Sequence, residues 1–167
     1  MSGSPVSPLV RRVARAPLVL YRWHLGWLLG HRFMLLVHTG RRTGLERRTV
    51  LEVVRYDGQT GQAVVVSGWG RTADWYRNIQ ARPASKVIVG RREFVPAHRD
   101  LTEDEAVSAL AGYERRNRIA APVIRRVFSR LTGCRYDGSD ESRRRLAREL
   151  PLVLFSPATG EAPAEGS

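Results

Sequence analysis

The sequence contains a single cysteine, Cys134, among 167 residues, so no disulfide can form within the chain. This scarcity is typical of a reducing compartment, and we expect the protein to be cytoplasmic. The four histidines are scattered and match no H-E-x-x-H or other zinc spacing, so no metal site is expected. The chain also lacks a G-x-S-x-G nucleophile motif and a G-x-x-x-x-G-K-[ST] phosphate loop. These absences argue against a disulfide scaffold, a zinc enzyme, a hydrolase with a nucleophile elbow and a P-loop NTPase.

Lysine is almost absent as well: Lys86 is the only one, so all but one of the 28 basic side chains are arginine, and the net charge is +12. A GC-rich coding sequence would favour arginine, but the guanidinium group also binds phosphates and carboxylates through paired hydrogen bonds. Residues 1–48 and 115–148 each carry a net charge of +8, whereas residues 49–114 carry −1. Such an excess suits a nucleic acid, an anionic cofactor or an acidic membrane surface, and charge alone does not separate them.

No apolar run is long enough to span a bilayer. Residues 17–29 (PLVLYRWHLGWLL) are apolar, but Arg22 and His24 interrupt them, and no small-residue cleavage site follows before Arg32. We expect this segment to form a helix that packs on its own domain. The alternative is peripheral contact with the inner face of the membrane through residues 9–29, because Trp23, Trp27 and the flanking arginines suit an interfacial helix.

Residues 9–156 are predicted to form a single domain between a disordered start (1–8) and a disordered tail (157–167), both rich in Pro, Gly, Ser and Ala. Helical patterns are expected at the N-terminal end (9–29) and again over residues 102–149. In the second region Thr102 and Glu105 form a capping box, and Pro122 suits the first turn of a helix over 119–131. A third helix is predicted at 140–149.

Short β patterns separated by turns lie between these helices, at residues 32–39, 47–56, 62–67, 86–89 and 93–99, with a final run at 152–155. Pro96 marks the strand over 93–99 as an edge or a bulge. An inserted helix is expected over 72–81, with Thr72 as its N-cap. Because no helix separates the first three strands, a parallel sheet is excluded. The sequence predicts an α+β, mainly β fold, an antiparallel barrel with helices at both ends.

Three segments could carry chemistry. Residues 39–49 (TGRRTGLERRT) form a glycine-bracketed loop that can offer N–H groups and guanidiniums to an anion, although a solvated hairpin would look the same. Residues 67–70 (SGWG) end a strand, where glycines allow a flat ligand to approach and a tryptophan to stack on it, but an ordinary glycine-rich turn is the alternative. Residues 74–78 (DWYRN) place two aromatics near the start of the inserted helix, where aromatics are more often core residues.

In this order, the three segments resemble the deazaflavin-dependent nitroreductase family, whose pattern is TGRKSGxxRxxP, a strand ending in S-x-G, and P-x-WYxNLxANP. The match runs over residues 36–101. The resemblance implies a split β-barrel, similar to flavin-reductase folds, that binds coenzyme F-420 in its reduced form. The phosphodiester and polyglutamate tail of that coenzyme would give the basic hairpin a chemical purpose.

The resemblance also implies roles for individual residues. Arg42 and Arg47 match the basic residues that hold the phosphate and tail, with Arg48 and Thr49 beside them. The segment that lies along the deazaflavin ring is matched by Ser67, Gly68, Trp69 and Gly70. Trp75 matches the aromatic near the ring, and Tyr113 falls near the substrate-side aromatics, where it is a candidate proton donor.

The implied function is hydride transfer from reduced coenzyme F-420 to a quinone or nitroaromatic acceptor, in which the cofactor does the chemistry. One alternative is a protein of the same fold that binds a deazaflavin, heme or a fatty acid without turnover. A less favoured alternative is an arginine-rich binder of nucleic acid or anionic membranes, and no specific nucleic-acid partner is expected.

Overall fold

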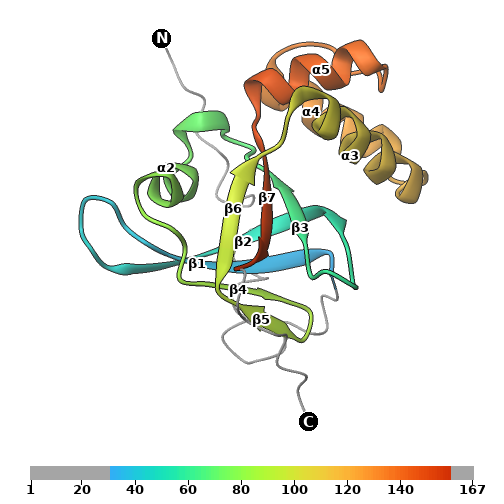
Figure 1. Cartoon of the computed structure of the whole chain (residues 1–167). Helices are drawn as coiled ribbons and strands as arrows, with labels where there is room; N and C mark the ends of the chain where they lie inside the picture. Colours follow the sequence, from blue (N-terminus) through green and yellow to red (C-terminus); the bar gives the residue numbers. More distant parts are fainter. Residues whose placement is uncertain (1–30, 159–167) are drawn as a thin grey trace.

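The computed structural model describes residues 31–158. The predicted helical segment at 9–29, the predicted disordered start at 1–8 and residues 159–167 of the predicted tail lie outside the described residues. Within the described part, a strongly curved antiparallel sheet carries one helix on one side and a group of three helices on another (Figure 1).

The sheet has seven strands in the order β5-β4-β1-β2-β3-β7-β6, and all neighbours pair antiparallel. The two edge strands, β5 and β6, are consecutive in the chain with only Val95 between them, so the sheet curls until its edges approach each other (Figure 1). The α+β, mainly β, split-barrel fold is therefore confirmed. The strands are β1 (Phe33–Thr39), β2 (Glu46–Tyr56), β3 (Ala63–Val66), β4 (Lys86–Val89), β5 (Arg92–Phe94), β6 (Pro96–Asp100) and β7 (Leu152–Pro157).

The helices begin where local signals place them. A short 3-10 turn, η2 (Gly70–Thr72), leads into α2 (Asp74–Ala81), and three helices follow β6: α3 (Glu103–Arg116), α4 (Ala121–Thr132) and α5 (Asp140–Glu149). The capping box of Thr102 and Glu105 is present at α3, Pro122 lies in the first turn of α4, and the Ser139 side chain caps α5. These three predicted helices are confirmed.

Two large hydrophobic cores stabilise the described part of the fold, and Leu35 and Val37 form a third, small cluster. The first fills the barrel and includes Met34, Leu36 and Phe155, together with Trp75 and Ile79 from α2. The second lies between the sheet and the three helices; in it Val64 and Leu154 meet apolar residues of all three, namely Leu110 from α3, Ile124 and Phe128 from α4, and Leu146 from α5. α2 therefore packs against the core inside the barrel, whereas α3, α4 and α5 pack against the outer face of the sheet.

The structure corrects three details of the sequence prediction. The predicted strand over 93–99 is two strands, because the chain turns at Val95 and its halves pair with β4 and β7 at opposite edges of the sheet. Thr72 does not cap a helix: its hydroxyl donates to the Trp69 carbonyl at 2.7 Å and closes η2, so α2 starts after Ala73. Residues 157 and 158, predicted to belong to a disordered tail, are ordered, since β7 includes Pro157 and the Ala158 N–H bonds to the Val95 carbonyl.

Candidate functional site

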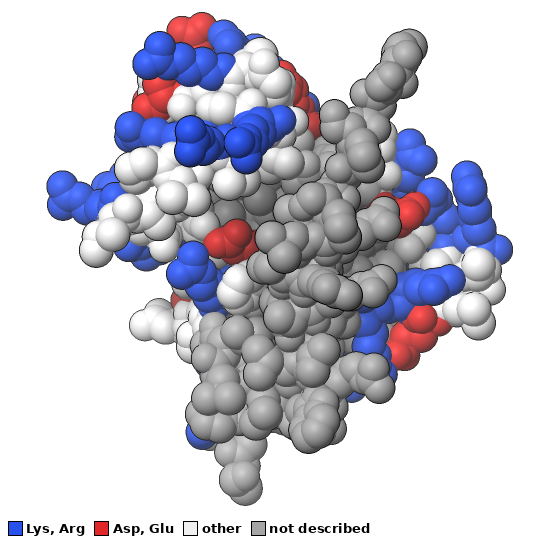
Figure 2. Space-filling view, turned by 180° about the vertical axis from the view of Figure 1, so that it is seen from behind, with Lys and Arg blue, Asp and Glu red and all other residues white. Residues whose placement is uncertain are grey.

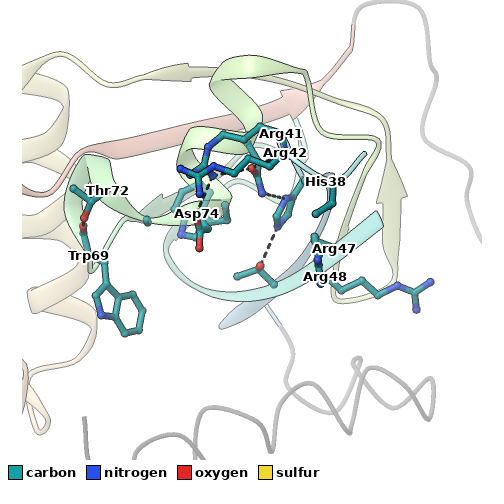
Figure 3. A pocket seen from close by; sticks show the side chains of 14 residues that line it. His38, Arg41, Arg42, Arg47, Arg48, Trp69, Thr72 and Asp74 are labelled. Atoms are coloured by element: carbon teal, nitrogen blue, oxygen red, sulfur yellow. Dashed lines mark hydrogen bonds and ion pairs between the residues drawn. The ribbon is translucent and has the colours of Figure 1, made fainter. Parts of the chain in front are cut away.

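A cavity of about 690 Å³ lies at one end of the barrel, between the β1–β2 hairpin, the turn after β3 and the start of α2. Figure 3 shows the side chains from these segments around it. A volume of this size is typical of a small-molecule or cofactor site. The residues that line it are His38, Gly40, Arg41, Arg42, Thr43, Arg47, Arg48, Thr49, Trp69, Thr72, Ala73, Asp74, Trp75 and Asn78.

The hairpin loop that forms one wall is built on two glycines. The Gly40 N–H bonds to the Leu45 carbonyl and the Gly44 N–H bonds to the Gly40 carbonyl, both at 2.8 Å. A Cβ at Gly40 would lie 2.7 Å from the Thr43 hydroxyl oxygen, and Gly44 has a φ of +68°. Since other residues rarely adopt that φ or tolerate that contact, both glycines are needed to fold the loop this tightly.

The four arginines of this wall have different partners. The Arg41 guanidinium donates to Asp74 at 2.9 Å, which lowers the pKa of that carboxyl. Arg48 pairs with Glu46 at 3.0 Å on the outer face of β2. Arg42 and Arg47 have no ion pair with any residue from 31 to 158. Two guanidiniums at the cavity therefore remain available to an anion.

Strand register explains why Arg47 and Arg48 differ. In the antiparallel β1–β2 pair, opposite residues point to the same face, and successive residues alternate. Arg47 is opposite His38 and therefore shares its face, whereas Arg48 is opposite Val37 on the other face. Thr49 is opposite Leu36, so it lies on the same face as Arg47. The core face of the hairpin thus offers Arg47 and Thr49 to the cavity.

A buried hydrogen-bond relay runs behind this wall (Figure 3). Asn78 of α2 accepts two hydrogen bonds at its side-chain oxygen, from the backbone N–H and the guanidinium of Arg41. Its amide nitrogen lies 3.1 Å from Nδ1 of His38, and Nε2 of His38 lies 3.1 Å from the Thr49 hydroxyl. Because the Asn78 oxygen is already occupied by donors, its NH₂ group donates to Nδ1, and His38 carries its proton on Nε2.

This arrangement keeps His38 neutral and directs Thr49. Burial lowers the pKa of His38, and the Arg47 charge lowers it further, while Asp74 acts in the opposite direction. The Thr49 oxygen accepts the Nε2–H bond, so its own hydroxyl hydrogen is free to be donated to a ligand in the cavity. The relay therefore converts Thr49 into an oriented donor beside Arg47.

The turn after β3 forms the opposite wall, although only part of it reaches the cavity. Ser67 is fully buried, and its hydroxyl donates to the Gly70 carbonyl at 2.7 Å. Gly70 has a φ of +60°, and a Cβ there would lie 3.0 Å from the Glu149 carbonyl oxygen. Ser67, Gly68 and Gly70 are absent from the cavity lining, so their position in the structure is that of a support that fixes the turn.

Two tryptophans that the turn and α2 supply do line the cavity. Trp75 is buried and packs edge-on against Tyr76, with ring centroids 5.9 Å apart. Trp69 is 68% exposed at the rim, where Figure 3 shows its ring projecting away from the hairpin arginines. An exposed indole at the mouth of a cavity is a ready stacking surface for a planar ligand.

Tyr113, the predicted substrate-side residue, lies elsewhere. It lines a separate cavity of about 390 Å³ with His31, Tyr56 and Arg116. Its hydroxyl donates to the Glu52 carboxylate at 2.6 Å, and burial together with this bond raises the pKa of Tyr113 well above its usual value. A tyrosine held in this way does not release a proton readily, and it is not among the residues of the first cavity.

The structure thus brings six of the predicted site residues to one cavity: Arg42, Arg47, Arg48, Thr49, Trp69 and Trp75. Sequence reasoning missed the relay of His38, Arg41, Asp74 and Asn78. In the sequence His38 is an isolated histidine in an apolar strand, and Asn78 is one residue of the aromatic motif over 74–78. No local pattern joins His38 to Asn78, because α2 must first dock on β1.

Within residues 31–158, no group of three or more potential His, Cys, Asp or Glu ligands is close enough to hold a metal ion. None of the helices described combines the length and apolarity needed to cross a bilayer.

The fold and the site together define a class: a small antiparallel split-barrel protein whose basic, tryptophan-rimmed cavity suits an anionic ligand with a planar ring. A model of the family described as F420H(2)-dependent quinone reductase matches residues 20–122. The chain belongs to this family, whose cofactor is coenzyme F-420.

Solved structures similar to this chain share little sequence with it. One, an F420-H2 dependent reductase, is 19% identical, with 76% of this chain and 96% of that chain covered and a TM-score of 0.43. A pyridoxamine 5'-phosphate oxidase-related, FMN-binding protein from Nostoc punctiforme is 12% identical, with 93% and 83% covered and a TM-score of 0.41. The heme storage protein HutZ from Vibrio cholerae is also 12% identical, with 84% and 92% covered and a TM-score of 0.41.

The residues present fit this cofactor. A phosphodiester and a carboxylate tail require several cationic or N–H donors, and the hairpin supplies two uncommitted guanidiniums and the Thr49 hydroxyl. A planar ring requires an apolar wall, and Trp69 and Trp75 provide one. The donor set and the aromatic wall lie in the same cavity, as one elongated anionic ligand with a ring would need.

Proposed function

We propose that this protein is an oxidoreductase that uses reduced coenzyme F-420, bound in the hairpin cavity, to reduce a quinone-type acceptor. The observation that carries the proposal is the pair of guanidiniums, Arg42 and Arg47, which form no ion pair within residues 31–158 and lie at a cavity that also offers two tryptophans. Family membership supports both the cofactor and the acceptor class. A nitroaromatic compound is a second acceptor worth testing, because it also accepts a hydride.

Each wall of the cavity has a distinct task in this proposal. Arg42 and Arg47 bind the phosphodiester and the carboxylate tail, and Thr49 donates its hydroxyl hydrogen to the same part of the cofactor. Trp69 and Trp75 hold the ring and exclude water from one of its faces. Asn78 and His38 position Thr49, while the Arg41–Asp74 ion pair fixes the hairpin to α2.

The chemistry itself requires little of the protein. When bound, the reduced coenzyme supplies a hydride, which together with one proton from water converts a quinone into a hydroquinone. The protein's contribution is binding, orientation and the exclusion of water, so no acid or base from the chain is assigned to the reaction. This agrees with the composition of the cavity, where Asp74 is held by Arg41 and His38 is held neutral.

Titration of the coenzyme by its fluorescence tests the binding half of the proposal. Replacing both guanidiniums, in R42A/R47A, removes two charge-assisted contacts and should weaken binding by about a hundredfold or more. The matched control is R144A/R148A, which also removes two arginines, but ones held by Glu103 and Asp104 on the helices. The control should bind the coenzyme as the unaltered protein does. Equal affinities of R42A/R47A and the unaltered protein would place the coenzyme elsewhere.

Turnover is a separate question with a separate measurement. Adding a soluble naphthoquinone to the complex with reduced coenzyme should oxidise the coenzyme at a rate that R42A/R47A lowers. Tight binding without oxidation by either a quinone or a nitroaromatic acceptor would instead mean that the protein carries the coenzyme without using it.

A further inference from the structure

The helix α4 exposes a row of large apolar side chains that nothing in residues 31–158 covers. Val123 is 65% exposed, Val127 46% and Leu131 41%, and Ile119, in the turn before the helix, is fully exposed. The spacing of four residues places them on one side of the helix. An exposed apolar strip of this kind marks an interaction surface more often than a solvated face.

Arginines border this strip without acidic partners. Successive helical residues are about 100° apart, so Arg126 and Arg130 lie next to the strip, on the side turned away from the buried Ile124 and Phe128. Neither arginine forms an ion pair within the described residues, and Arg115 and Arg118 before the helix form none there either. α4 itself contains no acidic residue. Figure 2 shows this part of the molecule, at the upper left, as uncharged surface bordered by basic side chains.

The arginines of the neighbouring helix α5 have acidic partners. On α5, Arg143 pairs with Glu114 and Asp140, Arg144 with Glu103 and Asp104, Arg145 with Glu141, and Arg148 with Glu103. Every arginine of α5 is thus balanced by a carboxylate. On α4 only Arg125 has one, Glu114 at 3.9 Å, whereas Arg126 and Arg130, beside the exposed apolar side chains, form no ion pair within residues 31–158.

We infer that the α4 surface, formed by Ile119, Val123, Arg126, Val127, Arg130 and Leu131, docks on a membrane that contains anionic lipids. The apolar strip would enter the boundary between headgroups and acyl chains, and the flanking guanidiniums would contact the lipid phosphates. The charge on the surface selects this partner, because an apolar protein partner would leave the arginines unpaired. A nucleic acid would leave the valines and leucine without a partner.

The α4 surface is continuous with the mouth of the hairpin cavity. A Cβ at Gly68 would lie 3.8 Å from a methyl carbon of Leu131, and the next residue, Trp69, lines the cavity rim. Docking through α4 would therefore place Trp69 and the rim close to the bilayer. The inference stands without the proposed function, but a lipid-soluble acceptor would gain a short route into the cavity if that function holds.

Co-sedimentation of the full chain with lipid vesicles tests this inference. The protein should bind vesicles of phosphatidylcholine with phosphatidylglycerol more strongly than vesicles of phosphatidylcholine alone. R126Q/R130Q should lower the partition coefficient for the anionic vesicles about thirtyfold, because each basic group near the surface strengthens binding by a factor of about five. V123S/V127S should lower it about tenfold on both kinds of vesicle.

Matched controls separate the α4 surface from general charge and apolarity. R77Q/R82Q removes two exposed arginines of α2 and its C-terminal boundary, and V95S removes an exposed valine between β5 and β6. Both controls should bind vesicles like the unaltered chain, and thermal melts should show all four variants folded. If the α4 variants bind as well as the controls, contact through residues 9–29 or another surface explains vesicle binding, and the inference is wrong.

Other occupants of the surface give different results. The unaltered chain could fail to bind vesicles and sediment as a dimer, with V123S/V127S sedimenting as a monomer. In that case the surface binds a second copy of the chain, and the inference fails. It fails equally if the chain binds duplex DNA but not vesicles, and R126Q/R130Q removes that binding. Coenzyme affinity should not change in either α4 variant, so failure here and failure of the proposed function remain distinguishable.

Discussion

The β1–β2 hairpin and the junction between α3 and α5 are both rich in arginine, yet they use it in opposite ways. At the junction Arg143, Arg144 and Arg148 each meet a carboxylate of α3, and the most buried of these carboxylates, Glu114, is only 7% exposed. At the hairpin, Arg42 and Arg47 lie at an open cavity and form no ion pair with residues 31–158, because Asp74, the carboxylate that lines it, is paired with Arg41. The difference teaches that an arginine count says little, and that the guanidiniums without partners indicate where a ligand is expected.

The largest effect should come from breaking the junction at Glu114. This carboxylate accepts hydrogen bonds from Tyr136 at 2.5 Å and from Arg143 at 3.1 Å, and burial and the bond raise the pKa of Tyr136 well above its usual value. E114A removes the buried partner of Arg143 and leaves it only the exposed Asp140, so it should lower the free energy of unfolding by about 3–5 kcal/mol in urea titrations. The control E141A, on an exposed pair with Arg145, should cost less than about 1 kcal/mol. Equal costs would show that the junction is not held by its buried pair.

Breaking the relay behind the hairpin should have a smaller effect on stability and a larger one on binding. N78L removes the acceptor of two Arg41 bonds and the donor to His38, so it should cost about 1–3 kcal/mol in the same titrations. It should also weaken coenzyme binding, because Thr49 loses its orientation. N117L, which removes an amide bonded to the Tyr113 carbonyl near the other cavity, is the matched control. A coenzyme affinity that falls equally in both variants would contradict the relay.

Through His38, both the free energy of unfolding and the coenzyme affinity of the hairpin cavity should depend on pH. Burial lowers its pKa in the folded state, so the unfolded chain binds protons first as the pH falls. The stability from neutral His38 is therefore complete above about pH 6.5 and declines as the pH falls toward the lower folded pKa. Coenzyme affinity should fall at lower pH, as the pH passes through the lowered pKa of the folded state, because protonated Nδ1 would face the Asn78 NH₂ group. Melting curves and titrations at several pH values measure both.

His98 supplies the control for this experiment. Burial lowers its pKa as well, but it lies on β6, outside the hairpin cavity. H98Q should alter the pH dependence of melting and leave that of coenzyme binding intact, whereas H38Q should alter both. Identical binding profiles for the two variants would remove His38 from the site.

The smallest effect should come from the exposed pairs of the junction. R144Q/R148Q removes the ion pairs that these two arginines form with Glu103 and Asp104. The side chains in these pairs are partly or largely exposed to solvent. Such pairs contribute little, so the variant should lose no more than about 1 kcal/mol of stability, and added salt should reduce the loss. A loss comparable to that of E114A would mean that the pairs act as one network.

The parts of the fold that the sequence predicts are those marked by local signals. The starts of α5 and α3 follow from capping residues within one turn, so they can be read directly from Ser139 and Thr102. The division of residues 93–99 into two strands could not be predicted in this way. It depends on β4 and β7, one of which lies more than fifty residues further along the chain.

The candidate site divides along the same line. Arg42, Arg47, Trp69 and Trp75 belong to compact motifs, and the structure brings all four to one cavity, although their roles there stay predictions. His38 and Asn78 are 40 residues apart, and their contact arises only when α2 packs on the barrel. Long-range packing, which periodicity does not encode, thus supplies the residues that orient those found by motif.

The position of β7 in the sheet sets the order in which the chain can fold. β7 is the last strand described, yet it lies between β3 and β6, and α3, α4 and α5 all precede it in the sequence. Until residues 152–157 arrive, β3 and β6 each expose an edge, and the apolar faces of the helices lack Leu152 and Leu154 as partners. During synthesis the sheet therefore stays incomplete until this strand has left the ribosome. A chain truncated before residue 152 would be prone to aggregation and proteolysis.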